Sequence, residues 1–346
     1  MRLCIAGTML GRHRGLAPGQ GEQVAALLEQ HGHHARTVSA AKRSVQRLAE
    51  ITTSILTARP AFDAVAIDTY SGRAFVIADA ASRAALARGT AVVFSLHGGA
   101  LPEMMADSPE WVRSVLSRAD AIVCQTPYLG RAMTRAGMSV ELVPNLVRTE
   151  RYPFLTRGPA RPRVLWMRTF HEIYGPAVAL EAFRILKRAY PEATLEMAGA
   201  DKGLLEETRR RALELGLEGS ITFPGFLDFP SKLRATADAD LFLNTSRVDN
   251  TPVAMIEACA TGMLVVSTRA GGIPDLVAHE ETALLVPIDD APALGAAMIR
   301  AVREPALARR LSTNGRELAE RSSPSAVLAR WEEVFASAIE RRRSRS

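Results

Sequence analysis

Short apolar runs alternate along the chain with segments in which apolar residues recur every three or four positions. Runs of strand length occupy five places in the first half, at 3–7, 64–68, 91–96, 121–125 and 140–144. Segments of helical period separate them, near 20–31, 41–58, 73–88, 108–118 and 127–136. Six further runs follow in the second half, at 163–167, 194–199, 220–225, 240–245, 264–268 and 283–287. Strands that alternate with helices of this length predict parallel sheets covered on both faces.

Residues 144–163 separate the two halves, show no clear period and contain four prolines. We therefore predict a domain boundary here, with one domain at 1–150 and a second at 151–323. Residues 324–341 form one amphipathic helix that starts at a Ser-Pro pair and runs into a basic tail ending at 346. The predicted fold class is α/β, with two doubly wound parallel-sheet domains and a cleft between them. Ligands of such sheets bind outside the carboxyl ends of the strands, so the residues that follow each strand are candidate site residues.

Composition narrows the class of protein. The chain has 346 residues, of which 47% are hydrophobic, enough for two domain cores, and 23% are charged, as in ordinary globular proteins. The three cysteines form no CxxC pair, which excludes a disulfide framework and a cysteine-type zinc site and suits a reducing compartment. No apolar run reaches bilayer length and the N-terminus lacks a signal-peptide pattern, so we expect a cytoplasmic protein whose mature chain starts here.

The net charge of +6 raises the chance of a phosphorylated or membrane-bound partner. The basic residues are scattered and aromatic residues make up only 5%, so nucleic-acid binding by base stacking is not expected. The basic stretches at 12–14 and 341–346 allow peripheral contact with anionic lipid, at ~1 kcal/mol for each basic residue near the surface. Alternatively, these two basic stretches are simply exposed to solvent, which explains their composition equally well.

Glu257 is the only charged residue in the apolar helix predicted within residues 246–262, where Thr251 suits the N-cap, Pro252 the first turn and Gly262 the C′ position. None of the residues three or four positions away is Lys or Arg. A carboxylate buried without partners costs several kcal/mol, so donors are expected from outside the helix, from protein or ligand. Adjacent sugar hydroxyls are good donors; alternatively, the carboxylate caps a neighbouring loop or reaches water.

Two further features follow strand ends. Gly271 and Gly272 precede a Pro-initiated helix, where backbone N–H groups can approach an anion, although a tight strand–helix turn has the same pattern. Arg168 ends the first strand of the second half, where its permanent charge faces the predicted cleft or serves a structural role.

From about 160 to 335, the chain resembles the donor-binding domain of the retaining, GT-B-fold glycosyltransferases of family 4 (glycosyl transferases group 1), which has two Rossmann-like domains facing across a cleft. The resemblance rests on an ordered set of motifs: Arg168, Gly199, FPGF at 223–226, SRVDNTPVAMIEACATGMLVVST at 246–268, then AGGIP and ALLVPIDD. The first half matches the acceptor-binding domain more loosely, through a loop with Gly19 and Gly21, LHGG at 96–99 and VPN at 143–145.

The resemblance implies roles for the second domain. Asp249 and Glu257 take the two acidic positions of the donor motif, so Glu257 would hold the ribose hydroxyls of a nucleotide sugar. The turn of Asp249, Asn250 and Thr251 would approach the transferred sugar and the diphosphate. Asp249 stands where the family has Glu and is one methylene shorter, so the backbone N–H groups of 249–251 would contribute more. Gly271 and Gly272 belong to the same donor site.

Arg168 matches the diphosphate-binding arginine, but Tyr174 or a neighbour stands where the family has a lysine. A second donor on the leaving group can contribute ~3 kcal/mol. We favour Lys202 as its replacement, although this residue also fits a solvated loop. The other candidates are Arg247, Arg269 and His171.

In the first domain, His97 would lie near the reacting sugar, and Gly19 and Gly21 on the acceptor side. The implied enzyme is a hexosyltransferase-type retaining glycosyltransferase that uses no cofactor or metal. It would move a sugar from a nucleoside diphosphate to a carbohydrate, lipid-linked or small-molecule acceptor. Domain closure around 144–162 and packing of the terminal helix against the first domain follow the family pattern.

Alternatives on the same fold are a nucleotide-sugar epimerase or a phosphorylase, and a non-catalytic nucleotide-sugar-binding member. A nicotinamide dehydrogenase is not expected, because no GxGxxG follows the first strand. His31, His33 and His34 follow a helix end and no acidic or cysteine partner is expected to join them, so no metal site is predicted there.

Overall fold

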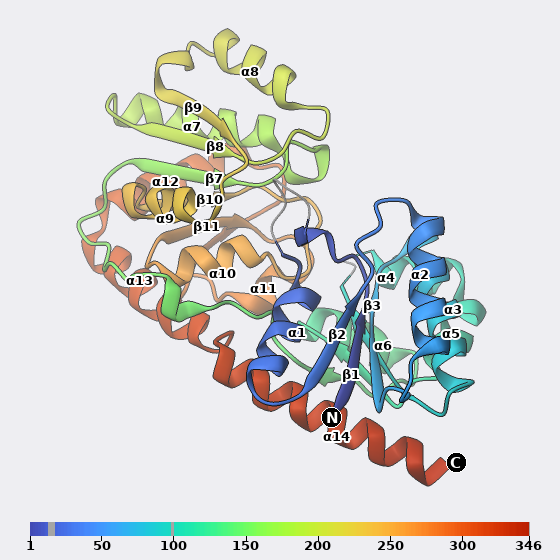
Figure 1. Ribbon diagram of the computed structural model, residues 1–346. Helices are drawn as coiled ribbons and strands as arrows, with labels where there is room; N and C mark the ends of the chain where they lie inside the picture. The colour runs from blue at the N-terminus through green and yellow to red at the C-terminus, as the bar shows by residue number, and fades with distance from the viewer. Residues whose placement is uncertain (13–17, 98–99, 346) are drawn as a thin grey trace. The chain divides into compact units, whose positions relative to one another are not determined.

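The computed structural model describes residues 1–12, 18–97 and 100–345. The chain divides into two compact units, Met1–Leu146 together with Pro324–Ser346, and Val147–Ser323 (Figure 1). The division falls after Leu146, against an expected boundary after residue 150, and the terminal helix belongs to the first unit.

The first unit is a six-stranded parallel sheet with the order β2-β1-β3-β4-β5-β6. Its elements are β1 Arg2–Ala6, η1 Leu10–Arg12, α1 Gln20–Gln30, β2 His34–Val38, α2 Ser44–Thr57, β3 Ala64–Thr69, η2 Gly72–Ala74, α3 Phe75–Leu86, β4 Ala91–Leu96, α4 Leu101–Asp107, α5 Pro109–Leu116, β5 Ala121–Cys124, α6 Pro127–Arg135, β6 Glu141–Leu142 and α14 Pro324–Arg345. The five predicted strands are confirmed. Strand β2 was missed because it is an edge strand whose sequence, HARTV, is half polar and half exposed.

Alternate residues of each strand pack on opposite faces of this sheet. Cys4 and Ala6 lie in the core that faces α2, α3, α5 and α6. Leu3 and Ile5 lie in the core that contains residues of α1 and α14, including Trp331. Helix α14 therefore covers one face of the first sheet, which Figure 1 shows beside α1.

The second unit is another six-stranded parallel sheet, with the order β12-β11-β10-β7-β8-β9. Its elements are η3 Thr149–Arg151, β7 Arg163–Met167, η4 Glu172–Tyr174, α7 Pro176–Ala189, β8 Thr194–Ala198, α8 Leu205–Glu214, η5 Glu218–Ser220, β9 Ile221–Gly225, α9 Phe229–Asp238, β10 Leu241–Asn244, α10 Val253–Ala260, β11 Leu264–Thr268, α11 Ile273–Leu276, β12 Leu284–Val286, α12 Ala291–Arg303 and α13 Pro305–Glu320. All six strands predicted for this half are confirmed.

The segment before β7, which has no sequence period, is packed into the second unit. Arg157 is buried and its guanidinium donates to Thr236 O at 2.8 Å. Asp240 lies 2.8 Å from Arg161 and closes the same cluster. Thr149 donates to Glu320 at 2.9 Å. These contacts fix the segment to its unit from Val147 onwards.

The strand order of each sheet reverses at one place, between β1 and β3 in the first and between β7 and β10 in the second. Strands on either side of such a point send their connections to opposite faces, which leaves a crevice at the carboxyl ends. These two points position the candidate sites.

Candidate functional site

Arg168 and Asp249 meet at the point of reversal in the second sheet. Arg168 follows β7, and its backbone N–H donates to Ala198 O at 3.0 Å. Its guanidinium forms an ion pair with Asp249, in the turn after β10, and donates to Asn244 Oδ1 at 3.2 Å. The Arg168 Cζ lies 4.9 Å from the centre of the Tyr174 ring, so this tyrosine stacks on the arginine.

Burial is the largest influence on Asp249 and raises the pKa of its carboxyl group. The charge of Arg168, the Ser246 hydroxyl and the Asn250 N–H act in the opposite direction without cancelling it. The side chains of Arg168 and Asp249 are both 13% exposed. An anion that binds Arg168 therefore either competes with the Asp249 carboxylate for the guanidinium or binds beside it.

Two glycines allow the backbone to close around this ion pair. Gly199 has φ +152°, and a Cβ there would lie 1.8 Å from Arg168 O. Gly271 has φ +50°, and a Cβ there would lie 2.1 Å from Asp249 O. Any other residue at either position forces one of these two loops to move.

The turn that contains Gly271 and Gly272 is tight. The Gly272 N–H donates to Asp249 O at 3.0 Å, so it is used within the protein. Helix α11, Ile273–Leu276, is a single turn of four residues. The backbone therefore has the tight-turn geometry, and binding of an anion by these glycines stays a prediction.

Helix α10 begins one residue later than predicted. Pro252 occupies the N-cap position, and no side chain caps the helix there, so the predicted Thr251 cap is wrong. Pro252 has φ −67° and ψ 107°, an extended conformation, so the helical conformation starts at Val253. Asn250 is buried and Thr251 half-buried in the turn before the helix. The prediction for Gly262 is confirmed, since it follows the helix with φ +81°.

Glu257 is buried and receives its hydrogen bonds from outside its own helix, as predicted. Its Oε1 accepts from Tyr152 Oη at 2.7 Å and from Lys232 Nζ at 2.7 Å. Burial, followed by the negative charge of Glu257, raises the pKa of Tyr152 well above its usual value. The sequence did not indicate Lys232, which is 25 positions away in α9 and within no local pattern.

The structure places the proposed replacement cations in different surroundings. Lys202 is exposed in the loop after β8. Arg247 lies 2.8 Å from Asp289 and is already in an ion pair. His171 accepts the Ile173 N–H at 3.2 Å as the N-cap of η4. Arg269 is exposed after β11.

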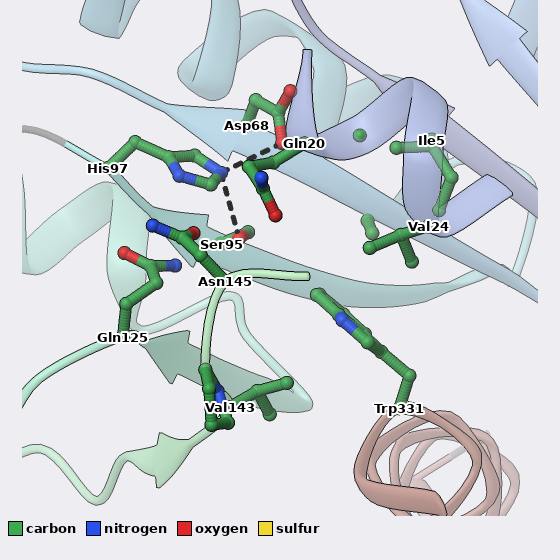
Figure 2. Close-up of a pocket in the computed structure, with 13 residues that line it drawn as sticks. Ile5, Gln20, Val24, Asp68, Ser95, His97, Gln125, Val143, Asn145 and Trp331 are labelled. Atoms are coloured by element: carbon green, nitrogen blue, oxygen red, sulfur yellow. Dashed lines mark hydrogen bonds and ion pairs between the residues drawn. The ribbon is translucent and has the colours of Figure 1, made fainter. Parts of the chain in front are cut away.

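His97 lies at the end of β4, beside the reversal point of the first sheet. Its Nε2 is 3.0 Å from Asp68 Oδ1 and 3.0 Å from Ser95 Oγ, as the dashed lines in Figure 2 mark. The Tyr70 ring stacks on its imidazole with centroids 5.5 Å apart. The residues of LHGG that follow, Gly98 and Gly99, lie outside the described residues.

A small pocket of about 20 Å³ adjoins this histidine within the first unit. Polar side chains of Gln20, Gln125 and Asn145 gather near His97, and Trp331 of α14 lies across the pocket with apolar neighbours (Figure 2). Gln20 exchanges two hydrogen bonds with the backbone of Leu146, at 2.6 and 3.1 Å, which fixes the start of α1. The pocket thus combines hydrogen-bonding groups with an apolar wall, as small-molecule sites commonly do.

Of the two glycines assigned to the acceptor side, only Gly21 lines the pocket. A Cβ at Gly21 would lie 2.8 Å from the Met9 side chain and 3.0 Å from Asp68 Oδ2. Gly19 is the N-cap of α1, and its N–H donates to Glu22 at 2.8 Å. Gly19 therefore shapes the helix start, whereas Gly21 allows the helix to approach Asp68.

Among the described residues, no three His, Cys, Asp or Glu side chains gather in a way that could hold a metal ion. The histidine cluster was expected to lack an acidic partner, which is wrong for His33: its Nε2 lies 2.8 Å from Glu332 of α14. The sequence could not show this, because the partner is 299 positions away.

Part of the basic tail is engaged within the first unit. Arg342 lies 2.7 Å from the fully buried carboxylate of Asp120, and Arg345 lies 3.4 Å from it. Arg341 donates to Asp120 O at 2.7 Å. These contacts reduce the charge available for lipid contact. None of the helices in the described ranges combines the length and apolar character needed to cross a bilayer.

Comparison with known proteins gives a family match and partial relatives. Residues 155–318 match the family described as Glycosyl transferases group 1. The amylovoran biosynthesis glycosyltransferase AmsK of Erwinia amylovora is 35% identical over 145 residues, which cover 40% of this chain and 35% of that protein. The aligned part is thus about a third of that relative's own length.

Solved structures match almost the whole chain. Anabaena HepE in complex with UDP and glucose has a TM-score of 0.76 at 16% identity, covering 97% of this chain and 100% of that one. Sucrose-phosphate synthase from Thermosynechococcus elongatus has a TM-score of 0.78 at 18% identity, covering 97% and 98%. At these identities the likeness concerns the fold, and the predicted GT-B class with two Rossmann-like parallel-sheet units is confirmed. Residues 155–318, in the second unit of this fold, therefore form a glycosyl transferases group 1 domain.

Proposed function

We propose that the protein is a glycosyltransferase that moves a sugar from a nucleoside diphosphate to an acceptor hydroxyl. The observation that carries the proposal is the arrangement of Arg168, Asp249 and Glu257 at the carboxyl edge of the second sheet, inside the group 1 domain. This edge combines a permanent cation for a diphosphate with a buried carboxylate for ribose hydroxyls.

Donor binding in this proposal uses the second unit. The Arg168 guanidinium neutralises the diphosphate, whose charge grows as the sugar leaves, and Glu257 accepts hydrogen bonds from the ribose. The Asp249 turn, with Asn250 and Thr251, lies next to Arg168 and contacts the transferred sugar. Because HepE was solved with UDP and glucose, a uridine nucleotide is the first donor to test.

Acceptor binding in this proposal uses the pocket around His97 in the first unit. The polar groups beside His97 bind acceptor hydroxyls, and an apolar wall that includes the buried Trp331 bounds this side of the site. The name of AmsK, a glycosyltransferase of amylovoran biosynthesis, makes a growing saccharide the acceptor class that we favour. Peripheral contact with anionic lipid has no further support.

Retention of the anomeric configuration, hexosyl specificity and independence of metal belong to the same proposal and rest on the family resemblance. The relatives named above are a glycosyltransferase and a synthase, which favours transfer over epimerisation, phosphorolysis or a non-catalytic role.

The test is the thermal stability and calorimetric binding of UDP, GDP and ADP, with EDTA and with Mg²⁺, on the wild type and Glu257→Gln. The matched control is Glu206→Gln, a carboxylate of α8 in the same unit whose side chain is 82% exposed. We expect one nucleotide to bind wild type and control without metal, and to bind Glu257→Gln at least tenfold more weakly, since a hydrogen bond to a charged group contributes ~1.5–3 kcal/mol.

Absence of binding for every nucleotide would overturn the proposal and favour a non-catalytic member. If a nucleotide binds, turnover of its sugar with and without an added saccharide acceptor follows. Product that forms equally without acceptor would point to hydrolysis or epimerisation, and proton NMR of the transferred sugar reports the anomeric outcome.

A further inference from the structure

The two carboxylate oxygens of Glu257 have different surroundings. Oε1 accepts both protein hydrogen bonds, from Tyr152 Oη and Lys232 Nζ. Within the described part of the chain, no hydrogen bond reaches Oε2. A carboxylate can accept about four hydrogen bonds, so the protein uses one oxygen and leaves the other for a ligand.

Lys232 is held by a rigid first turn of α9. Asp228 caps this helix by accepting the Ser231 N–H at 2.9 Å, and Lys232 donates its own backbone N–H to Asp228 O at 2.8 Å. Its side chain is 18% exposed and that of Glu257 11%, so both charges of the pair are largely withdrawn from water. In such surroundings an ammonium fixes a carboxylate more firmly than on an open surface.

Tyr152 approaches the same oxygen from a second segment, which packs against the first residue of α9. Its ring contacts Phe229 edge to face with centroids 5.5 Å apart, and the Arg151 guanidinium lies 3.9 Å from the centre of the Phe229 ring. The Tyr152 carbonyl accepts from Arg316 at 3.0 Å. Two donors, one from α9 and one from the segment that packs against the start of α9, therefore determine the rotamer of Glu257.

We propose that Lys232 is a positioning residue of the nucleotide site. It acts with Tyr152 to saturate Oε1, so that Glu257 presents Oε2 to the paired hydroxyls of a ribose. This inference rests on the proposed function and adds a residue that sequence reasoning did not single out. It has a specificity consequence: an oxygen held in one place discriminates a ribose from a 2′-deoxyribose, whereas a carboxylate free to rotate does so less.

The experiment measures calorimetric affinities of UDP, GDP and ADP and of their 2′-deoxy counterparts. Lys232→Met keeps the length of the side chain and removes the charge, Lys232→Arg keeps the charge, and Tyr152→Phe removes the second donor. The matched control is Lys187→Met, a lysine of α7 in the same unit whose ammonium contacts the carbonyl oxygen of Ala193 at 3.0 Å. Thermal melting confirms that each variant is folded.

For the nucleotide that binds the wild type, we expect Lys232→Met to lower the affinity about tenfold or more, and Lys187→Met to leave it unchanged. The ratio of ribo to 2′-deoxy affinity should fall towards one in Lys232→Met, fall partly in Tyr152→Phe and be largely retained in Lys232→Arg. A purely structural role would weaken both nucleotides equally and keep this ratio.

Wild-type affinities and ratios in folded Lys232→Met would overturn the inference while leaving the proposed function intact. If Lys232→Met does not fold, an unchanged ratio in Tyr152→Phe overturns it instead. Failure of the wild type to bind any of the nucleotides would remove the proposed function and the inference together.

Discussion

Gly271→Ala should destabilise the second unit and displace the Asp249 turn. Gly271 has φ +50°, a left-handed conformation that costs a non-glycine residue about 1 kcal/mol. The added Cβ would also lie 2.1 Å from Asp249 O, so the turn must shift and the 3.0 Å hydrogen bond from Gly272 N–H to that oxygen is lost. The bond contributes about 1 kcal/mol and the displaced packing about 1 kcal/mol more.

Gly216→Ala separates the two components of this cost. Gly216 has φ +67° and ends α8 in the same unit, but a Cβ there meets no atom within 4 Å. It should therefore lose only the backbone component of about 1 kcal/mol. In scanning calorimetry, a unit of this size loses about 2–4 °C per kcal/mol, so we expect about 2–4 °C for Gly216→Ala and about 6–12 °C for Gly271→Ala.

Nucleotide binding gives the second measurement on the same pair. Displacement of Asp249 disturbs its ion pair with Arg168, so the affinity should fall in Gly271→Ala and stay at the wild-type value in Gly216→Ala. Equal Tm shifts in the two variants would show that the contact with Asp249 O carries no cost and would refute this reasoning.

Three further predictions follow: two concern the carboxylates of Asp79 and Asp120, and the third concerns the close approach at Gly199. Burial, the largest single influence, raises the pKa of Asp79, but hydrogen bonds from two arginines and a tryptophan together lower it from 3.8 to about 2. Asp79→Asn should therefore lower the free energy of unfolding by about 1–2 kcal/mol in urea at pH 7. The difference in unfolding free energy between wild type and variant should shrink as the pH falls from about 4 to 2, because the ionised carboxylate contributes its full stabilisation only above 3.8. Asp120→Asn leaves Arg342 without its charged partner, so we expect about 3 kcal/mol of destabilisation and faster tryptic cleavage in the terminal helix; unchanged cleavage would argue against this anchor. Gly199→Ala should lose about 3 kcal/mol in thermal unfolding and Gly216→Ala only about 1, since a Cβ lies 1.8 Å from a carbonyl oxygen in the first and meets nothing in the second; similar losses would contradict the contact.

The central strands were predictable because they are buried on both faces. Central parallel strands such as β4, AVVFSL, are continuous apolar runs because helices cover each side of the sheet. The edge strand β2 is half exposed, so its sequence has no such run and was missed. The end of α10 at Gly262 was also local, because a left-handed residue after a helix favours glycine.

The amino-acid sequence by itself determined which side chains follow strand ends, and with them Arg168, His97 and the Asp249 turn. It also determined that Glu257 needs a partner beyond its own helix, because helical neighbours are fixed by chain spacing. Only the tertiary structure decided which residues are the partners: Lys232 and Tyr152 are 25 and 105 positions away along the chain. Hydrogen bonds act over about 3 Å whatever the separation along the chain, so distant pairs leave no local pattern and form only when packed segments bring them together.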